Sequence, residues 1–236
     1  MTGHAESEPP VLAIDGPSGT GKGTIAGRVA EQLGWHILDS GALYRAIGFL
    51  AVENHIEPND IRALRVLAES SVVEFSSTPT GVNILVDQRD ITEEVRSESG
   101  AKNASIYAKI PALREALLKR QRALRAHPGL VADGRDMGTV VFPDAFLKVF
   151  LDASASVRAE RRHNQLREKG FDVKLRGLER EIAERDEQDR KRAVSPLVPA
   201  VDAIVLDTST KDIAQVFTDV MQLVDERLVA KRFTRA

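Results

Sequence analysis

A glycine-rich segment, placed between an apolar run and a helical pattern, constrains the fold of this chain more than any other feature. Residues 11–15 are typical of a buried strand, and residues 16–24 have the sequence Gly-Pro-Ser-Gly-Thr-Gly-Lys-Gly-Thr. An apolar stripe at helical spacing then continues to Leu33. Glycines allow backbone N–H groups to surround a phosphate, the helix N-terminus adds positive charge, and Lys22 supplies a mobile cation. This order predicts a phosphate-binding loop; the alternative is a plain glycine-rich turn.

The end of this loop departs from the most familiar version of the motif. That version has Ser or Thr directly after the lysine to hold Mg²⁺. Here Gly23 occupies that position, and the hydroxyl follows one residue later at Thr24. The Gly-Lys-Gly-Thr ending resembles nucleoside monophosphate kinases rather than GTPase switches. The resemblance implies a Mg²⁺ ion held mainly by nucleotide phosphates and water, with no direct protein ligand.

Composition excludes several other classes of protein. The chain has 236 residues, 42% hydrophobic and 29% charged, which is typical of a globular domain. A net charge of −2 and an aromatic content of 5% disfavour a nucleic-acid-binding module. Cysteine is absent from the sequence, which rules out disulfides and thiolate chemistry. No apolar run has membrane-spanning length. Residues 1–10 lack the pattern of a signal peptide and predict a disordered tail, so we expect a cytoplasmic protein.

Strand and helix patterns alternate along most of the chain, which predicts an α/β fold with a parallel sheet and helices on both faces. Residues 72–96 differ, because short strand patterns separated by a turn indicate a small antiparallel insertion. The predicted strands are residues 11–15, 35–38, 72–75, 82–86, 89–91, 129–133, 147–151 and 203–206. After the first helix, the predicted helices are residues 42–53, 59–70, 97–107, 111–126, 154–168, 178–191 and 212–229. Ligands should bind at the carboxyl ends of the parallel strands.

Charged residues follow two of these strands. Asp39 and Ser40 come directly after residues 35–38, where either could bind a ligand or simply cap the next helix. The sequence Asp-Gly-Arg-Asp, from Asp133 to Asp136, follows residues 129–132. Capping explains this second group less well, because no helical pattern starts there. We therefore expect Asp133 to Asp136 to lie at the same rim of the sheet as the phosphate loop.

Four segments together resemble bacterial cytidylate kinase. They are the loop at 16–24, Asp-Ser-Gly-Ala-Leu-Tyr-Arg at 39–45, Asp-Gly-Arg-Asp-Met-Gly-Thr-Val-Val-Phe-Pro at 133–143, and residues 185–199. The resemblance extends from about residue 11 to residue 224. It implies a three-layer P-loop fold with a central parallel sheet, a small antiparallel NMP-binding insertion and a helical lid. One kinase domain would cover residues 11–230, with its core at 11–58, 108–153 and 193–230, the insertion at 59–107 and the lid at 154–192.

The resemblance also implies the roles of individual residues. ATP would be bound by Gly16, Pro17, Ser18, Gly19, Thr20, Gly21, Lys22, Gly23 and Thr24. CMP would be bound by Ser40, Arg45, Ser105, Arg114, Asp133, Arg135, Asp136, Arg185, Asp189 and Arg192. Within this set, the cytosine base would be bound by Asp136, Ser40, Arg114 and Arg192. The phosphate would be bound by Arg45 and Arg135, and the sugar hydroxyls by Arg185, Asp189 and Ser105. The catalytic residues would be Lys22, Arg135, Arg158 and Arg162.

Residue chemistry supports part of this assignment and leaves alternatives elsewhere. A carboxylate such as Asp136 suits the exocyclic amine of cytosine and opposes the corresponding oxygen of uracil. Taken alone, Arg114 could be a solvated surface charge. Arg185, Asp189 and Arg192 recur at i, i+4 and i+7, which is also typical of an exposed ion-pair stripe.

Arg158, Arg161 and Arg162 share one side of a predicted helix. They could form a lid over the triphosphate or a plain solvated face.

No general base is needed, because the second pKa of a monophosphate is about 6 and the attacking oxygen is already anionic. The sequence thus predicts a monomeric kinase that uses ATP and Mg²⁺ to phosphorylate CMP and dCMP. The alternatives are a UMP, AMP or shikimate kinase and a nucleotide-controlled switch, although the Asn-Lys-x-Asp motif of such switches is absent.

Overall fold

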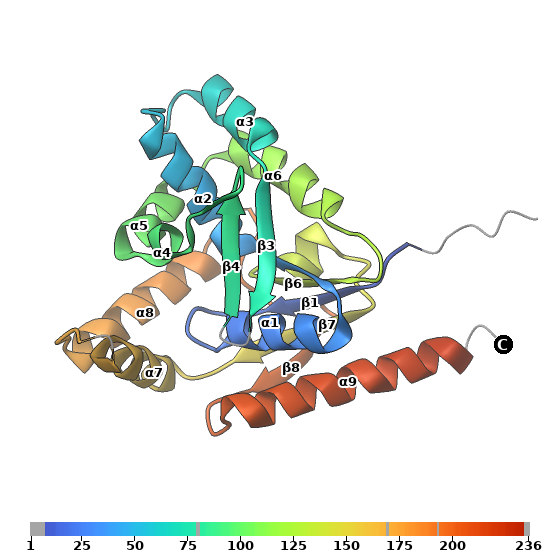
Figure 1. Cartoon of the computed structure of the whole chain (residues 1–236). Coiled ribbons are helices and arrows are strands. Elements are labelled where there is room, and N and C mark those ends of the chain that lie inside the picture. Colours follow the sequence, from blue (N-terminus) through green and yellow to red (C-terminus); the bar gives the residue numbers. More distant parts are fainter. Residues whose placement is uncertain (1–7, 79–80, 169, 193, 234–236) are drawn as a thin grey trace, which may run out of the picture.

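A parallel sheet of five strands lies at the centre of the protein in a computed structural model that describes residues 8–78, 81–168, 170–192 and 194–233 (Figure 1). The strands are β1 (Val11–Asp15), β2 (His36–Asp39), β6 (Leu130–Gly134), β7 (Leu147–Asp152) and β8 (Ile204–Asp207), in the order β2-β6-β1-β7-β8. All four pairings are parallel. The parallel sheet predicted from the alternating pattern is confirmed.

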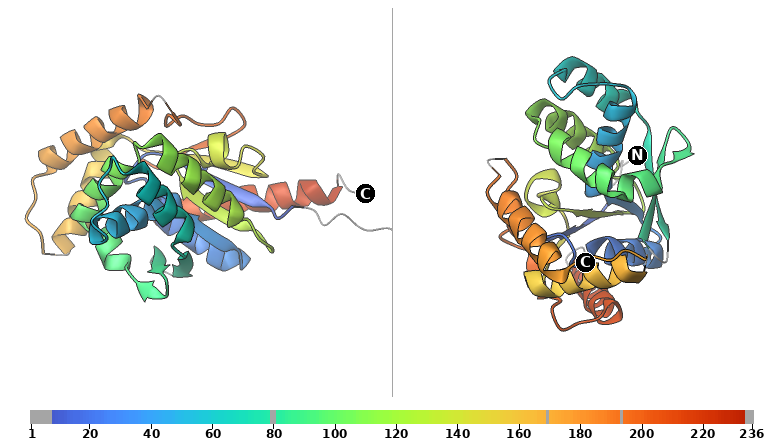
Figure 2. Two further views of the ribbon diagram at one scale, coloured as in Figure 1. Left: turned by 90° about the horizontal axis from the view of Figure 1, so that it is seen from above. Right: turned by 90° about the vertical axis from the view of Figure 1, so that its left-hand side faces the viewer.

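Helices cover both faces of this sheet (Figure 2). α1 (Lys22–Leu33) and α9 (Ile213–Phe233) pack on one face, whereas α2 (Ser40–Glu53) and α6 (Pro111–Ala123) belong to the other. The central strand β1 supplies apolar side chains to both layers, because successive residues of a strand point to opposite faces. Leu12 and Ile14 pack with α1, and Val11 and Ala13 pack with α2. β1 is therefore buried on both sides, as its continuous apolar run predicts.

The antiparallel insertion is present and lies against the core. It contains β3 (Val73–Thr78), β4 (Gly81–Val86) and β5 (Arg89–Asp90), flanked by α3 (Ile61–Ser70), α4 (Thr92–Arg96) and α5 (Glu98–Tyr107). β3 and β4 pack against α1, and β3 also lies beside β2 at the edge of the parallel sheet. The short helix α4 is absent from the sequence prediction, because one turn and a half is too short to establish a helical period.

Two helices pack side by side at one end of the molecule, α7 (Ala155–Glu168) and α8 (Leu175–Arg190). α8 begins at Leu175, earlier than the predicted start at residue 178, and it ends one residue early at Arg190. In the described part of the chain, every helix is too short or too polar to cross a membrane. Residues 1–7 of the predicted tail lie outside the described residues. The carbonyl groups of Pro9 and Pro10 accept hydrogen bonds from Arg125 and Leu130.

A single turn of π-helix, η1 (Met137–Val141), follows β6 directly. The expectation that no helix starts after Asp136 is therefore wrong. A five-residue turn with i→i+5 hydrogen bonds has no recognisable apolar period, so the sequence pattern does not reveal it. This turn lies at the carboxyl end of the sheet, where β1, β2, β7 and β8 also end in aspartate.

Candidate active site

The phosphate loop, residues 16–24, runs from the end of β1 to the first turn of α1. Three of its glycines, Gly16, Gly19 and Gly21, have positive φ angles of 147°, 84° and 88°. Space is also limiting at Gly16, where a Cβ atom would lie 2.1 Å from the carbonyl oxygen of Leu151. The loop thus adopts a backbone that side chains at these positions would prevent. All nine residues predicted to bind ATP lie in this turn, at the helix N-terminus.

Lys22 is the first residue of α1 and is only 6% exposed. Its Nζ atom donates a hydrogen bond to the carbonyl oxygen of Pro17 over 2.8 Å, which folds the side chain back over the loop. Burial, and after it the positive charge of Arg135, lowers the pKa of Lys22 to about 8. The carboxylate of Asp133 opposes this shift. Lys22 is therefore a cation held in a site where its charge is costly.

Asp133, near the end of β6, is the carboxylate that opposes the shift most strongly. It is 7% exposed, and its Oδ2 atom lies 3.4 Å from the position that a Cβ atom of Gly23 would occupy. Burial raises the pKa of Asp133 to about 7, although Lys22 lowers it. Asp133 was predicted to contact CMP; in the structure it faces the phosphate loop. The two buried groups thus act on each other through their opposite charges beside the loop.

Asp136 and Arg114 form the centre of a second group of polar side chains. Nη2 of Arg114 donates to Oδ2 of Asp136 over 2.9 Å, and both side chains are largely buried. The Arg114 guanidinium also lies 5.6 Å from the centre of the Tyr44 ring, a cation–π distance. Burial raises the pKa of Tyr44 to about 12, and the charges of Arg114, Asp136 and Arg192 all reach it. Arg114 is thus no solvated surface charge, and Tyr44 is a member of this group that sequence reasoning left out.

Tyr44 could have been found from its spacing. It lies four residues after Ser40 on α2, so the two side chains share a helix face. Ser40 itself is 5% exposed and starts the helix. The cap of α2 is provided by Asp39, whose Oδ1 atom accepts a hydrogen bond from the Ala42 N–H over 2.8 Å. Of the two readings of residues 39 and 40, capping holds for Asp39, which leaves the Ser40 side chain free of that role.

Several arginines lie around Asp189, between the group around Asp136 and the phosphate loop. Nε of Arg135 donates to Oδ2 of Asp189 over 3.0 Å, and Arg192 pairs with the other oxygen. Asp189 is only 2% exposed and Arg185 is partly buried, so the predicted stripe is centred on a buried carboxylate and is no exposed ion-pair face, although Arg192 itself is exposed. Arg192 lies beyond the end of α8 at Arg190 and reaches Asp189 from the following loop.

Two further arginines of this cluster, Arg45 and Arg185, have no ion-pair partner within the described part of the chain. Each is partly buried, and burial is the main cause that lowers its pKa. Nearby positive charges lower these pKa values further: the charge of Arg135 acts on both arginines, and that of Arg162 also acts on Arg45. Cations held together without enough carboxylates make a site for an anion with several negative charges. Ser105, which was predicted to join this site, lies on α5, but its side chain is outside the described residues.

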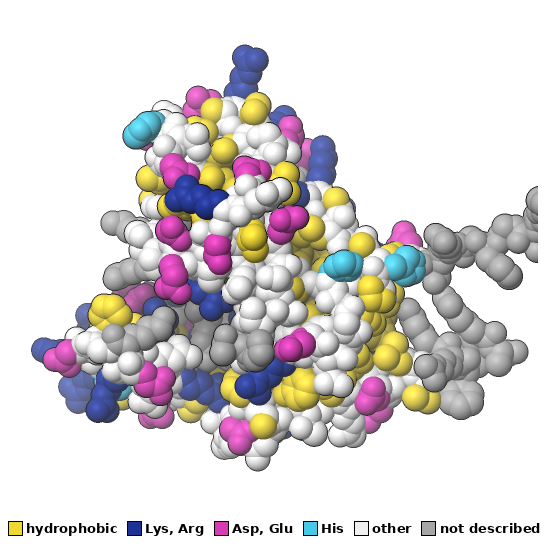
Figure 3. Space-filling view, viewed as in Figure 1, with side chains coloured by type: hydrophobic (Ala, Val, Ile, Leu, Met, Phe, Trp, Pro, Cys, Tyr) yellow, Lys and Arg dark blue, Asp and Glu magenta, His cyan; other side chains and the backbone are white. Residues whose placement is uncertain are grey.

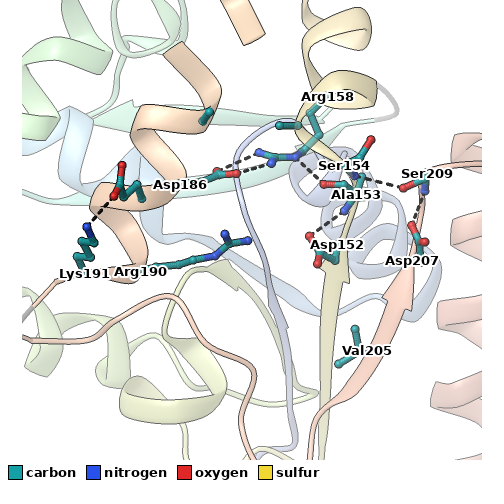
Figure 4. A pocket seen from close by; sticks show the side chains of 13 residues that line it. Asp152, Ala153, Ser154, Arg158, Asp186, Arg190, Lys191, Val205, Asp207 and Ser209 are labelled. Atoms are coloured by element: carbon teal, nitrogen blue, oxygen red, sulfur yellow. Dashed lines mark hydrogen bonds and ion pairs between the residues drawn. The ribbon is translucent and has the colours of Figure 1, made fainter. Parts of the chain in front are cut away.

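The predicted lid arginines differ in their surroundings. Arg158 is 2% exposed and donates to the carbonyl oxygens of Ala153 and Ser18, over 2.9 and 3.0 Å. It also forms a two-pronged ion pair with Asp186 of α8 (Figure 4). This pair forms one wall of a cavity of about 710 Å³ between α8 and the ends of β7 and β8. Arg158 thus links α7, α8 and the phosphate loop.

Arg161 is also engaged with the protein, since it donates to the backbone carbonyls of Thr208 and Lys211. Arg162 is exposed, and its charge reaches Arg45 in the arginine cluster. Figure 3 shows Lys and Arg side chains gathered over α7 and α8 at the lower left of the molecule. Of the three arginines, Arg162 is the one whose guanidinium is free to meet a ligand in this conformation.

Asp15, the last residue of β1, is a site residue that sequence reasoning missed. It is 5% exposed and accepts hydrogen bonds from the N–H groups of Met137 and Gly138, over 2.9 and 2.8 Å. Burial raises its pKa to about 6, against the effect of these two hydrogen bonds. The available signal was an aspartate at the end of an otherwise apolar strand, immediately before the loop.

The chain resembles known proteins over most of its length. A family model described as Cytidylate kinase matches residues 12–226. The chain is 52% identical over 219 residues to a protein of Klebsiella pneumoniae strain 342 named Cytidylate kinase, covering 93% of this chain and 96% of that one. The same values hold for the Cytidylate kinase of Escherichia coli K12. An uncharacterized protein from Eubacterium ventriosum shares the fold, with a TM-score of 0.50, 12% identity and coverage of 93% and 99% of the two chains.

Proposed function

Since the chain belongs to the cytidylate kinase family and is a phosphotransferase, we propose that it transfers the γ-phosphoryl group of ATP to CMP and dCMP, giving CDP and dCDP. The observation that carries the proposal is the arginine cluster between the loop that holds Lys22 and the pocket that holds Asp136. Among the described residues neither Arg45 nor Arg185 forms an ion pair there, although the charges of Asp39 and Asp189 act on them, and this suits a phosphate held between Lys22 and Asp136.

Asp136 and Arg114 would read the cytosine base. The carboxylate accepts from the exocyclic amine, and the guanidinium donates to the N3 and O2 acceptors. Their mutual hydrogen bond of 2.9 Å fixes both groups before the base arrives. Uracil presents an oxygen where cytosine has its amine, so Asp136 would repel it and lose a hydrogen bond. Ser40 and Tyr44, four residues apart on α2, would line the same pocket.

The transfer itself would depend on alignment and charge neutralisation. The acceptor phosphate is already a nucleophile at neutral pH, because its second pKa is about 6, so the proposal needs no general base. Arg45 and Arg135 would hold that phosphate with planar guanidinium groups, and Arg185 with Asp189 would hold the sugar. Lys22 and Arg162 would reach the transferring group from the loop and from α7. Arg158 would act from its position between Ser18 and Asp186, where it sets the spacing of lid and loop.

The residues around the loop are compatible with Mg²⁺ bound through phosphates and water. The described residues contain no group of three or more His, Cys, Asp or Glu side chains that could hold a metal ion by themselves. Asp133, whose charge acts on Lys22, would supply carboxylate oxygens that accept hydrogen bonds from the waters of the ion. When bound, Mg²⁺ would neutralise part of the phosphate charge. We further propose residues 59–107 as the NMP-binding part and residues 154–192 as the lid; a monomeric state and a cytoplasmic location stay predictions.

A coupled ADP-release assay with CMP, dCMP, UMP, AMP and GMP tests the acceptor assignment. We expect turnover of CMP and dCMP. In Asp136→Asn, kcat/KM for CMP should fall by about 10- to 150-fold, the effect of losing a charged hydrogen bond, and the preference over UMP should shrink. Asp144→Asn is the matched control, because it also removes a carboxylate paired with arginine, Arg125, but far from the pocket. Turnover of none of the five acceptors, or equal losses in both variants, would contradict the proposal.

A further inference from the structure

The first turn of η1 has an unusual cap. Asp136 occupies the N-cap position, yet its side chain makes no capping hydrogen bond. An aspartate at this position normally accepts from the N–H group two or three residues further on, and the N–H groups of the first turn are otherwise unsatisfied. Here those N–H groups, of Met137 and Gly138, donate to the two carboxylate oxygens of Asp15. The cap therefore comes from a residue 122 positions earlier in the chain.

We propose that Asp15 is a positioning residue for acceptor recognition: by capping η1, it releases the Asp136 carboxylate to face Arg114 and the acceptor base. This inference rests on the proposed function, since it explains how that pocket is set. Without Asp15, the N–H groups of Met137 and Gly138 would be left buried and unpaired. The nearest carboxylate that could satisfy them is that of Asp136, which would then turn away from the pocket.

The surroundings of Asp15 leave little room for another arrangement. Its Oδ2 atom lies 3.4 Å from where a Cβ atom of Gly138 would be, and the stem of Lys148 lies 3.1 Å from the same point. A glycine at 138 thus permits the close approach of η1 to the strand end. Asp15 is also the residue before Gly16, so it fixes the acceptor-reading turn to the start of the phosphate loop.

If Asp15 were only a structural cap, its loss would change ligand affinities in a different pattern than the loss of a positioning cap. A structural cap would affect the binding of CMP, UMP and ATP alike, or only thermal stability. A positioning cap that acts through Asp136 would weaken only the binding of CMP, which Asp136 favours, and would not weaken the binding of UMP, which Asp136 opposes. Asp15→Asn is the informative change, because the amide keeps one acceptor oxygen and the size of the side chain but cannot accept both N–H groups.

The experiment is calorimetric titration of the full-length protein with CMP, UMP and ATP, together with steady-state kinetics. Asp15→Asn should weaken CMP binding by about tenfold, the effect of one buried hydrogen bond, leave ATP binding within about twofold, and leave UMP binding unchanged or stronger. In an Asp136→Ala background, Asp15→Asn should have no further effect on CMP binding. Asp60→Asn, which weakens a cap of α3 far from the site, should leave all three affinities unchanged.

Equal losses for CMP and UMP, or an undiminished effect of Asp15→Asn in the Asp136→Ala background, would overturn the inference. If Asp15→Asn does not fold, Gly138→Ala approaches the same contact from η1 and should reduce the CMP preference in the same direction; an unchanged preference would overturn the inference. A wild-type protein that binds no CMP would overturn the proposed function as well. A wild-type protein that binds CMP while both variants keep its preference would refute only the role of Asp15.

Discussion

The titration of Lys22 offers a quantitative test of how the phosphate loop works. Burial holds the pKa of this lysine at about 8, compared with 10.5 in an ordinary lysine. The difference corresponds to about 3 kcal/mol by which the folded protein disfavours the charged form. ATP binding requires the ammonium, so above pH 8 the protein must take up a proton when it binds. The apparent affinity should therefore fall about 25-fold between about pH 7.5 and about pH 9.5.

Two substitutions should shift, in opposite directions, the pH at which the affinity for ATP falls. Asp133 raises the pKa of Lys22 and Arg135 lowers it. Asp133→Asn should therefore bring the loss of ATP affinity to lower pH, and Arg135→Gln should delay it to higher pH. Asp144→Asn removes a carboxylate near Arg125, away from the loop, and should not change the pH at which the affinity for ATP falls. The pH dependence of ATP itself is common to all four proteins and cancels in the comparison.

The assay is ATP titration across this pH range, with the Lys22 ammonium followed in parallel by NMR of lysine labelled with ¹³C at Cε. We expect one lysine signal to titrate near pH 8 in the free protein and to be lost in Lys22→Met. Shifts of the same sign in Asp133→Asn and Arg135→Gln would refute the reasoning, since they would mean that general loosening of the site, and not charge, sets the pKa.

Two predictions concern stability and are checked by urea unfolding followed by circular dichroism. Gly16→Ala should lower the free energy of unfolding by more than about 3 kcal/mol, because its Cβ would overlap the Leu151 carbonyl. Gly34→Ala, at a residue with a φ of 64° and open space around it, should lower the free energy of unfolding by only about 1 to 2 kcal/mol. Equal losses in the two variants would contradict this explanation. Asp186→Asn should lower it by about 3 to 5 kcal/mol, because Arg158 would be left buried and unpaired. Glu187→Gln, one residue away but exposed with Lys191, should leave stability unchanged, and a loss like that of Asp186→Asn would count against the burial explanation.

Features that depend on local chemistry could be predicted from the sequence. The loop at residues 16–24 was recognisable because glycines, a lysine and a preceding apolar strand are close in the chain. The rim position of residues 133–136 was also predictable, since in a parallel sheet all strands end at the same edge. The α/β architecture followed from the alternating periods. In each case the signal is a pattern that can be recognised locally in the sequence, without knowledge of which distant side chains meet.

Features that depend on a distant partner could not be predicted. Arg158 has the spacing of a lid cation, and only the folded arrangement brings it to Asp186, 28 residues away, where both are buried. Arg114 likewise needs Asp136 to be distinguished from a surface charge. A charged side chain is assigned to solvent by default, because burial without a partner is costly. Which carboxylate pairs with each arginine is decided by the fold, so the burial of the arginine can be known only from the fold.

The two buried aspartates at the rim show where more could have been read from the sequence. Asp133 is in register with Ile14, whose side chain packs on the α1 side, so Asp133 faces the phosphate loop. Asp15 is one residue further along β1 and must point to the opposite face, where η1 lies. Strand alternation and parallel register are therefore enough to assign one carboxylate to the phosphate loop and the other to η1. What alternation cannot supply is the π-helical turn itself, and it is this turn that makes Asp15 a cap and leaves Asp136 free.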